Sequence, residues 1–524
     1  MKHGAPVVAA LAAALALPSL FNGFVYDDVL VILQNPLVHG LSHSGELWHS
    51  SYWPAGLLYR PLTSQLFALQ WALGGGSPMV FHAVSILLAA VTAALVFRLC
   101  GRLLPPPAAL LAAVLFALHP VHVEVVANVV GQAELLAAIC ALLAVERYLA
   151  WSAQGELSQL QRLLLAGLTL LGILAKETGY VIPLLLAAAQ LTLAGQRRER
   201  PGDFYVLQGA AVVVGLLLRL AVLGGLAGEN PAAIFRGVGA GSRAIAMLAV
   251  VPEWARLLLW PAHLQAEYGP PALPVSASPG FAHFAGLILL AAVAALVARN
   301  WRRRPVLAFG LLWMLLGLAP VSNVAAATGI LMAERTLFLP SVGLALVLGA
   351  ALASLRPRWS AAPAGLRVAA AGGALGLLGL AAARDLTRQA AWRSQEAFFA
   401  QLQRDAPRTY RAHFVASRYF YGERRFAEAE RAARRALALY SLDPQVHEQL
   451  GQALRVQGRC GEALPILAVG VRLAPDRTTV RSRLIECALT AGDTARALAA
   501  ANEAVALGQA EFRGTAERLT RPRP

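Results

Sequence analysis

The feature that most constrains this chain is a series of apolar segments, each approaching the roughly twenty residues that an α-helix needs to cross a bilayer. About eleven segments of this kind lie at residues 5–21, 79–99, 107–120, 131–150, 160–176, 179–195, 204–226, 279–298, 305–320, 336–355 and 365–383. Of the 524 residues, 57% are hydrophobic and 14% are charged, which is far more apolar than a soluble globular protein. The sequence therefore predicts an all-α, polytopic membrane protein.

The arginines between these segments predict how the chain is oriented. Lys2 precedes the first segment, which resembles a retained signal anchor, and arginine-bearing connections follow at 98–102, 147–162, 196–200, 302–304 and 356–367. All of them fall on the side of Lys2 if the stretch 243–260 does not cross the bilayer. We therefore expect an interfacial or re-entrant helix at 243–260, a cytoplasmic N-terminus and an extracytoplasmic C-terminus. The net charge of +16 is explained mostly by this bias, so nucleic-acid binding is not indicated.

The C-terminal fifth has a different pattern, rich in alanine and arginine. Ala429, Ala463 and Ala497 recur at a period of 34 residues, which is the tetratricopeptide period. The predicted domains are a membrane domain at 1–385 with a first extracytoplasmic loop at 22–78, a connecting helix at 386–408, about three repeats at 409–510 and a basic tail at 511–524. The repeats are expected to stack into a short α-solenoid with a concave face.

The four cysteines show no metal-ligand spacing. Cys100 and Cys140 lie in or beside apolar segments, where a thiol behaves as a small hydrophobic group. Cys460 and Cys487 lie on neighbouring predicted helices, and they could pair if that region is extracytoplasmic. Whether they do is left open.

Two adjacent carboxylates, Asp27 and Asp28, follow the first apolar segment directly. A carboxylate at a membrane surface is unfavourable unless it meets water, a cation or a substrate, so the pair is a candidate site. The alternative is a solvated pair that only marks the membrane boundary.

Other polar residues fall on the same predicted side of the membrane as this pair. They are Arg60, His82, His119, His122, Glu124, Glu134, Lys176, Glu177, Glu267, Glu334 and Arg335. Each has a structural alternative, such as helix termination at His119, which precedes a proline, or an ion pair between neighbours. His122 and Glu124 are two residues apart and diverge on a helix, so no metal site is expected. Together the residues indicate a site for an anionic, lipid-linked substrate, with cations holding a phosphate and a carboxylate acting as base.

Motifs spread over nearly the whole chain resemble the transmembrane and tetratricopeptide-repeat O-mannosyltransferases and their bacterial relatives. The matching stretches are FVYDD at 24–28, YRPLT at 59–63, FHAV at 81–84, LFALHPVHVE at 115–124, GQAELL at 131–136, AKETG at 175–179, PAHLQAEY at 261–268 and AERTLFLPS at 333–341. Two positions depart from the animal pattern. Gln132-Ala133-Glu134 replaces a stretch with arginine, and Glu267 replaces an aspartate.

The resemblance implies a C-type glycosyltransferase fold in a bacterial inner membrane, with the repeats outside. Such an enzyme takes a sugar, in this family mannose, from a polyprenyl-phosphate carrier and transfers it with inversion to an acceptor on the outer face. Carried over by motif, Asp27 or Asp28 would deprotonate the acceptor hydroxyl, and Arg60, His122, Lys176 and Arg335 would hold phosphate or sugar. The lipid tail would lie between spans near 243–260. No cofactor or divalent metal is expected, because the donor is the lipid-linked sugar itself.

Three functions remain open from the sequence alone. The first is a protein O-glycosyltransferase whose repeats bind the acceptor polypeptide. The second is an enzyme of the same fold with a lipid or envelope-glycan acceptor. The third is a non-enzymatic membrane scaffold, which would tolerate the loss of both Asp27 and Asp28.

Overall fold

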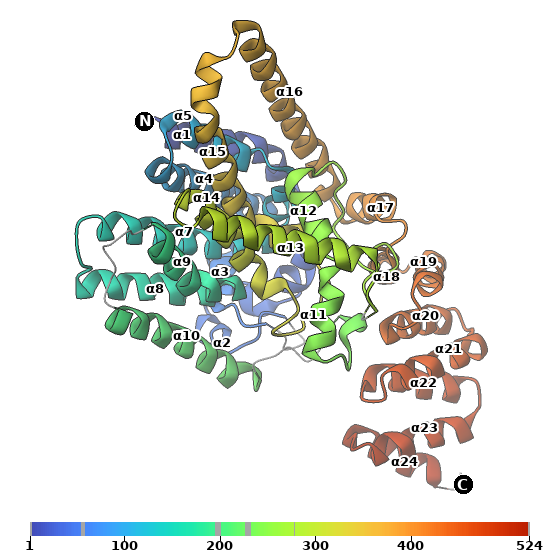
Figure 1. Ribbon diagram of the computed structural model, residues 1–524. Coiled ribbons are helices and arrows are strands. Elements are labelled where there is room, and N and C mark those ends of the chain that lie inside the picture. Colours follow the sequence, from blue (N-terminus) through green and yellow to red (C-terminus); the bar gives the residue numbers. More distant parts are fainter. Residues whose placement is uncertain (1–2, 54–57, 194–200, 226–231, 277, 522–524) are drawn as a thin grey trace. The chain divides into compact units, whose positions relative to one another are not determined.

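The computed structural model describes residues 3–53, 58–193, 201–225, 232–276 and 278–521. Within these ranges the regular structure is helical, without β-strands, so the predicted all-α class is confirmed (Figure 1). The chain forms two compact units, one comprising residues 1–230, 240–266 and 276–398 and the other comprising 231–239, 267–275 and 399–524. Lys2 and the arginines at 196–200, which support the predicted orientation, lie outside the described residues.

The first unit contains the apolar helices. Its α-helices are α1 (Gly4–Ala16), α2 (Ser44–Leu47), α3 (Pro61–Gly74), α4 (Pro78–Leu103), α5 (Pro106–Ala117), α6 (Val123–Ala127), α7 (Gln132–Ser152), α8 (Gln159–Ala175), α9 (Ile182–Leu193), α10 (Pro201–Leu223), α11 (Ala240–Leu248), α12 (Val251–Leu259), α13 (Phe281–Asn300), α14 (Pro305–Leu318), α15 (Phe338–Ala361) and α16 (Ala364–Gln389).

Each of the eleven predicted apolar segments is helical, but not every helix is long enough to span a bilayer alone. Among the described residues, seven helical stretches meet the length and hydropathy that a crossing requires: Gly4–Phe21, Pro78–Leu103, Val129–Ser152, Gly202–Leu223, Phe281–Asn300, Glu334–Leu355 and Ala364–Trp392. An eighth, Pro106–Ala117 with Pro120–Ala127, is bent by 46° at the predicted His119–Pro120 break, because proline cannot continue the first helix. The shorter apolar helices Gln159–Ala175, Glu177–Leu193 and Pro305–Val321 account for the remaining three segments.

The stretch 243–260 was expected to be one interfacial or re-entrant helix. It forms two short helices instead, α11 and α12, separated by Ala249 and Val250. Neither is among the stretches long enough to cross a bilayer. Because Glu253 and Arg256 pair with each other on α12, their charges are compensated within one helical turn.

Small residues bring the membrane helices close together. A Cβ on Gly310 of α14 would lie 2.8 Å from the carbonyl oxygen of Gly343 on α15, and one on Gly343 would lie 2.4 Å from the carbonyl oxygen of Gly310. Such small-residue contacts are typical of helix packing in membranes, where lipid provides no hydrophobic drive between helices. The buried Trp313 indole then donates to the carbonyl of Leu339 at 2.8 Å, which joins the same two helices.

A break between α8 and α9 carries two of the predicted site residues. α8 ends at Ala175, Lys176 is extended, and a 3₁₀ turn at Glu177–Val181 leads into α9. The turn lies against α8 because Gly179 has no side chain: a Cβ there would lie 2.1 Å from the carbonyl carbon of Gly172. This contact therefore fixes the positions of Lys176 and Glu177.

The second unit consists largely of helices that pack each on the next in chain order. They are the end of α17 (Gln395–Asp405), α18 (Tyr410–Gly422), α19 (Phe426–Leu439), α20 (Pro444–Val456), α21 (Cys460–Leu473), α22 (Thr478–Thr490), α23 (Thr494–Ala506) and α24 (Arg513–Thr520). The alanines that recur at a period of 34, Ala429, Ala463 and Ala497, are all fully buried. The period thus coincides with helix contacts, and assignment as tetratricopeptide repeats stays a prediction.

The thiols of Cys460 and Cys487 are free and buried in the second unit. Burial and the neighbouring Cys460 thiol raise the pKa of Cys487 to about 12, so this thiol is protonated at neutral pH.

We expect Gly179→Ala to reduce the free energy of unfolding by about 3 kcal/mol, because the added methyl group meets backbone atoms that cannot move aside. Gly167→Ala on α8 is a matched control, since nothing lies within 4 Å of its Cβ position. Thermal unfolding of the two variants in detergent should show a loss for Gly179→Ala alone. Equal midpoints would contradict the role given to this contact.

Candidate active site

The loop with the two aspartates is held in an unusual backbone conformation. Tyr26 has a φ of 59°, a left-handed value that costs a non-glycine residue about 1–3 kcal/mol. Its amide donates to the Gln395 side chain at 2.9 Å, and its ring packs against Phe398 with centroids 5.0 Å apart. These contacts stabilise the turn immediately before Asp27 and Asp28.

Asp28 is a structural residue in this arrangement. Its side chain is fully buried, and its carboxylate accepts hydrogen bonds from the amides of Val25 at 3.3 Å, Val129 at 3.2 Å and Val130 at 2.9 Å. Burial raises the pKa of Asp28 to about 7, against the opposing effect of the three amides. The Asp28 carboxylate therefore holds the loop against the turn before α7, and a substrate cannot reach it.

Asp27 has a different environment although it is adjacent in sequence. Its side chain is 15% exposed, and a guanidinium nitrogen of Arg335 lies 3.7 Å from its carboxylate. The same guanidinium pairs with the buried Glu124, whose other oxygen accepts the amide of Arg335 at 2.9 Å. Glu124 therefore orients Arg335 towards the accessible aspartate.

Two further cations are held by carboxylates from other parts of the unit. Lys176 pairs with Glu134 near the start of α7. Arg60, just before α3, donates to Glu177 at 3.0 and 2.7 Å, and it lies over the Tyr52 ring at 5.0 Å. In both pairs the partners come from segments far apart in the sequence.

Lys176 connects these ion pairs into one electrostatic cluster. The Lys176 ammonium is buried, and the Glu134 carboxylate balances its charge. The charges of Arg60 and Arg335 also act on Lys176, so the three cations belong to one group. Arginine and lysine side chains grouped in this way can donate charge-assisted hydrogen bonds to a phosphate.

Arg219 on α10 also belongs to this cluster, and we did not identify it from the sequence. It is 8% exposed and lies 3.4 Å from the Glu177 carboxylate. The sequence does indicate this residue, since Arg219 is the one charged residue of the apolar segment 204–226. A charge within a membrane segment is a candidate functional residue.

The three predicted histidines are each bonded to the protein itself. His82 bonds the carbonyl of Gly23 at 3.3 Å, and His119 bonds that of Leu258 at 2.9 Å. His122 bonds the Ser341 hydroxyl at 2.8 Å and packs between Phe116 and Phe338. These contacts favour structural roles for the imidazoles.

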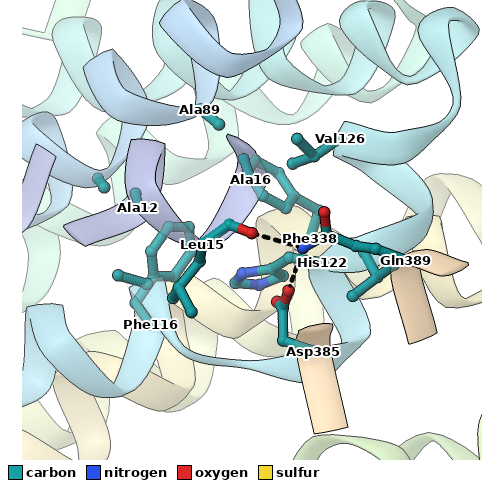
Figure 2. Close-up of a pocket in the computed structure, with 13 residues that line it drawn as sticks. Ala12, Leu15, Ala16, Ala89, Phe116, His122, Val126, Phe338, Asp385 and Gln389 are labelled. Atoms are coloured by element: carbon teal, nitrogen blue, oxygen red, sulfur yellow. Dashed lines mark hydrogen bonds between the residues drawn. The ribbon is translucent and has the colours of Figure 1, made fainter. Parts of the chain in front are cut away.

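His122 also lines an apolar pocket between helices (Figure 2). Alanine is the most frequent residue in its wall. The Gln389 amide donates to the carbonyl of Leu15 at 2.7 Å and to Asp385 at 2.5 Å, and Figure 2 draws both bonds. Asp385 was missed because it lies two residues beyond the predicted segment 365–383.

The remaining predicted residues have other partners. Glu334 accepts the amide of Gln265, and Glu267, in the second unit, accepts from Arg411 at 2.8 Å. Gln132, at the departure from the animal pattern, is buried and bonds Gln70 at 2.8 and 3.0 Å and the carbonyl of Phe81 at 3.0 Å. Its amide is therefore occupied by protein contacts.

Within the described part of the chain, no three histidine, cysteine, aspartate or glutamate side chains converge as metal ligands would. The carboxylates of the site are instead paired with arginine and lysine.

Comparison with known proteins identifies similar sequences. The family model for dolichyl-phosphate-mannose-protein mannosyltransferase matches residues 60–223, a range that contains Arg60, Glu124, Glu134, Lys176 and Glu177. The chain is 36% identical to protein O-mannosyl-transferase Tmtc2 of Drosophila melanogaster over 289 residues, covering 50% of this chain and 30% of that protein. It is 29% identical to human protein O-mannosyl-transferase TMTC4 over 477 residues, covering 78% of this chain and 62% of that protein.

The alignments thus span less than two thirds of the length of either relative. They nevertheless support the resemblance seen in the motifs: at modest identity, this chain is similar to the TMTC-type protein O-mannosyl-transferases.

Proposed function

We propose that the chain is an integral-membrane, inverting glycosyltransferase that moves mannose from a polyprenyl-phosphate carrier to a serine or threonine hydroxyl of a polypeptide. The reaction takes place at the extracytoplasmic face. The observation that carries the proposal is the difference between two adjacent aspartates: Asp28 is buried under three amides, whereas Asp27 is accessible and faces Arg335.

In the proposed reaction Asp27 is the base. The acceptor oxygen attacks C1 of the sugar from the side opposite the phosphate, and its proton passes to the Asp27 carboxylate. The bond between C1 and the phosphate oxygen breaks, and its electron pair leaves with the polyprenyl phosphate. A base and a leaving group on opposite sides of the sugar give inversion.

Arg60, Lys176 and Arg335 stabilise the departing phosphate. Their charges are balanced by Glu177, Glu134 and Glu124, so the cations are compensated before a substrate arrives. Cations that are already oriented need no reorganisation as negative charge develops on the phosphate. Arg219 shares Glu177 with Arg60 and helps to keep that carboxylate in place.

The comparisons support the choice of reaction. The matched family is described by a dolichyl-phosphate-mannose donor, and the relatives are named protein O-mannosyl-transferases. A membrane scaffold would have no evident need for one buried and two partly exposed cations grouped near an accessible carboxylate. The lipid tail of the carrier would lie between the membrane helices, and the repeats would bind the acceptor.

Asp27→Asn should lower the rate of transfer by about 10²–10⁴-fold, because an amide cannot accept the hydroxyl proton. Its thermal stability should match the wild type, since Asp27 is partly exposed. The assay measures transfer of radiolabelled mannose from polyprenyl-phosphate-mannose to membrane proteins.

Asp28→Asn is the matched comparison. In this variant the side-chain NH₂ group would face backbone N–H donors that bind a carboxylate oxygen in the wild type. Losing such a hydrogen bond costs about 1–3 kcal/mol of unfolding free energy. We expect lower stability with substantial transfer by the folded fraction. Full transfer by Asp27→Asn, with transfer abolished in a stable Asp28→Asn protein, would reverse the two roles.

Transfer should be insensitive to a chelator, because the proposed phosphate site uses arginine and lysine in place of a divalent ion. The measurement is the initial rate with and without EDTA. Loss of activity that manganese or magnesium restores would show that a metal takes part.

A further inference from the structure

A second concavity lies within the second unit, outside the cluster described above. It has a volume of about 270 Å³, is open to solvent, and is formed by α17, α18 and α19. Its lining includes His413, Phe420, Glu428, Arg431 and Arg435. All of these residues belong to the second unit, so the concavity does not depend on how the two units are arranged.

Two of the lining arginines form no ion pair with any described residue. Arg431 and Arg435 are exposed, and no carboxylate in the described part of the chain lies within ion-pair distance of either. They are four residues apart on α19, so their side chains share one face, where like charges repel by about 0.2–0.5 kcal/mol. An anionic ligand would relieve that repulsion.

The carboxylate in the lining is engaged mainly by a third arginine. Glu428 accepts two hydrogen bonds from Arg425, at 2.5 and 2.7 Å, and these bonds, with the nearby charges of Arg425 and Arg431, hold the pKa of Glu428 below its usual value. One carboxylate therefore faces three arginines. Burial lowers the pKa of His413, and the positive charge of Arg435 lowers it further. Both observations agree with a positive potential in the concavity.

The concavity also has an aromatic surface. The Phe420 ring is half-buried, and one of its faces carries the Arg425 guanidinium at 4.7 Å. A hollow with an aromatic wall and two cations at its edge admits an extended chain with alternating acidic and apolar side chains. An apolar side chain beside carboxylates fits such a hollow better than a flat layer of lipid headgroups does.

We propose that this concavity binds an acidic polypeptide segment, whose carboxylates pair with Arg431 and Arg435 while an apolar side chain contacts Phe420. The inference rests on the proposed function only in identifying the bound segment as part of the acceptor. The proposal predicts that acceptor proteins carry acidic stretches apart from the serine or threonine that is modified. The binding itself requires neither donor nor catalysis.

The test is a fluorescence-anisotropy titration of the full-length protein in detergent with a labelled synthetic peptide of alternating glutamate and phenylalanine. Replacing Arg431 and Arg435 together by glutamine should weaken binding by about tenfold or more, as expected for losing charge-assisted hydrogen bonds. Arg434→Gln is the matched control, because Arg434 is exposed on the same helix but already pairs with Glu430 at 2.8 Å and Glu462 at 3.5 Å. Its affinity should equal that of the wild type.

Peptide composition provides the second arm. A peptide with glutamine in place of glutamate should bind weakly, and added salt should weaken binding of the acidic peptide. Equal binding of the two peptides, or unchanged binding by the double variant, would overturn the proposal. So would a double variant that loses binding to phosphatidylglycerol vesicles but keeps the peptide, since the arginines would then serve a membrane surface.

The Asp27→Asn protein separates this inference from the proposed function. It should bind the acidic peptide as tightly as the wild type does, because the concavity lies in a different unit. Peptide binding without mannose transfer in the wild type would retain the binding site and reject the proposed reaction.

Discussion

A charged side chain in the interior of a membrane protein is stable only where an opposite charge or hydrogen bonds replace the water it has lost. The first unit meets this requirement with ion pairs between distant segments: Arg60 with Glu177, Lys176 with Glu134 and Arg335 with Glu124. Removing one partner of such a pair leaves an uncompensated buried charge, which typically costs ~3–5 kcal/mol. The pairs therefore tie the helices together and at the same time set the geometry of the candidate site.

The same requirement explains how two adjacent aspartates acquire different roles. The left-handed turn at Tyr26 precedes a buried Asp28, whose three amide donors substitute for water, and an accessible Asp27, which meets Arg335. One carboxylate fixes the loop and the other remains available for chemistry. Gly179 contributes in a comparable way, because its close contact with α8 fixes the turn that carries Lys176 and Glu177.

The helical membrane fold could be predicted from the sequence because apolar length and helix period are local properties. The break at His119–Pro120 and the period of 34 were equally visible, and both coincide with features of the structure. The pairing of carboxylates with cations could not be predicted, since Glu124 meets Arg335 across more than two hundred residues of sequence. The different burial of Asp27 and Asp28 could not be predicted from the sequence either, because they have the same side chain and only tertiary contacts distinguish them. Arg219 could have been identified as a candidate site residue from the sequence, because a single charged residue in an apolar segment indicates a functional role.

The central claim is that Arg60, Lys176 and Arg335 hold the phosphate of the donor while Asp27 faces the opposite side of the sugar. The most direct test is a cryo-electron microscopy structure of the full-length protein with polyprenyl-phosphate-mannose bound. The account predicts density for the phosphate within hydrogen-bond distance of these cations, with C1 of the sugar between the phosphate and the Asp27 carboxylate. A phosphate bound elsewhere, or a sugar with Asp27 on the same side as the phosphate, would contradict it.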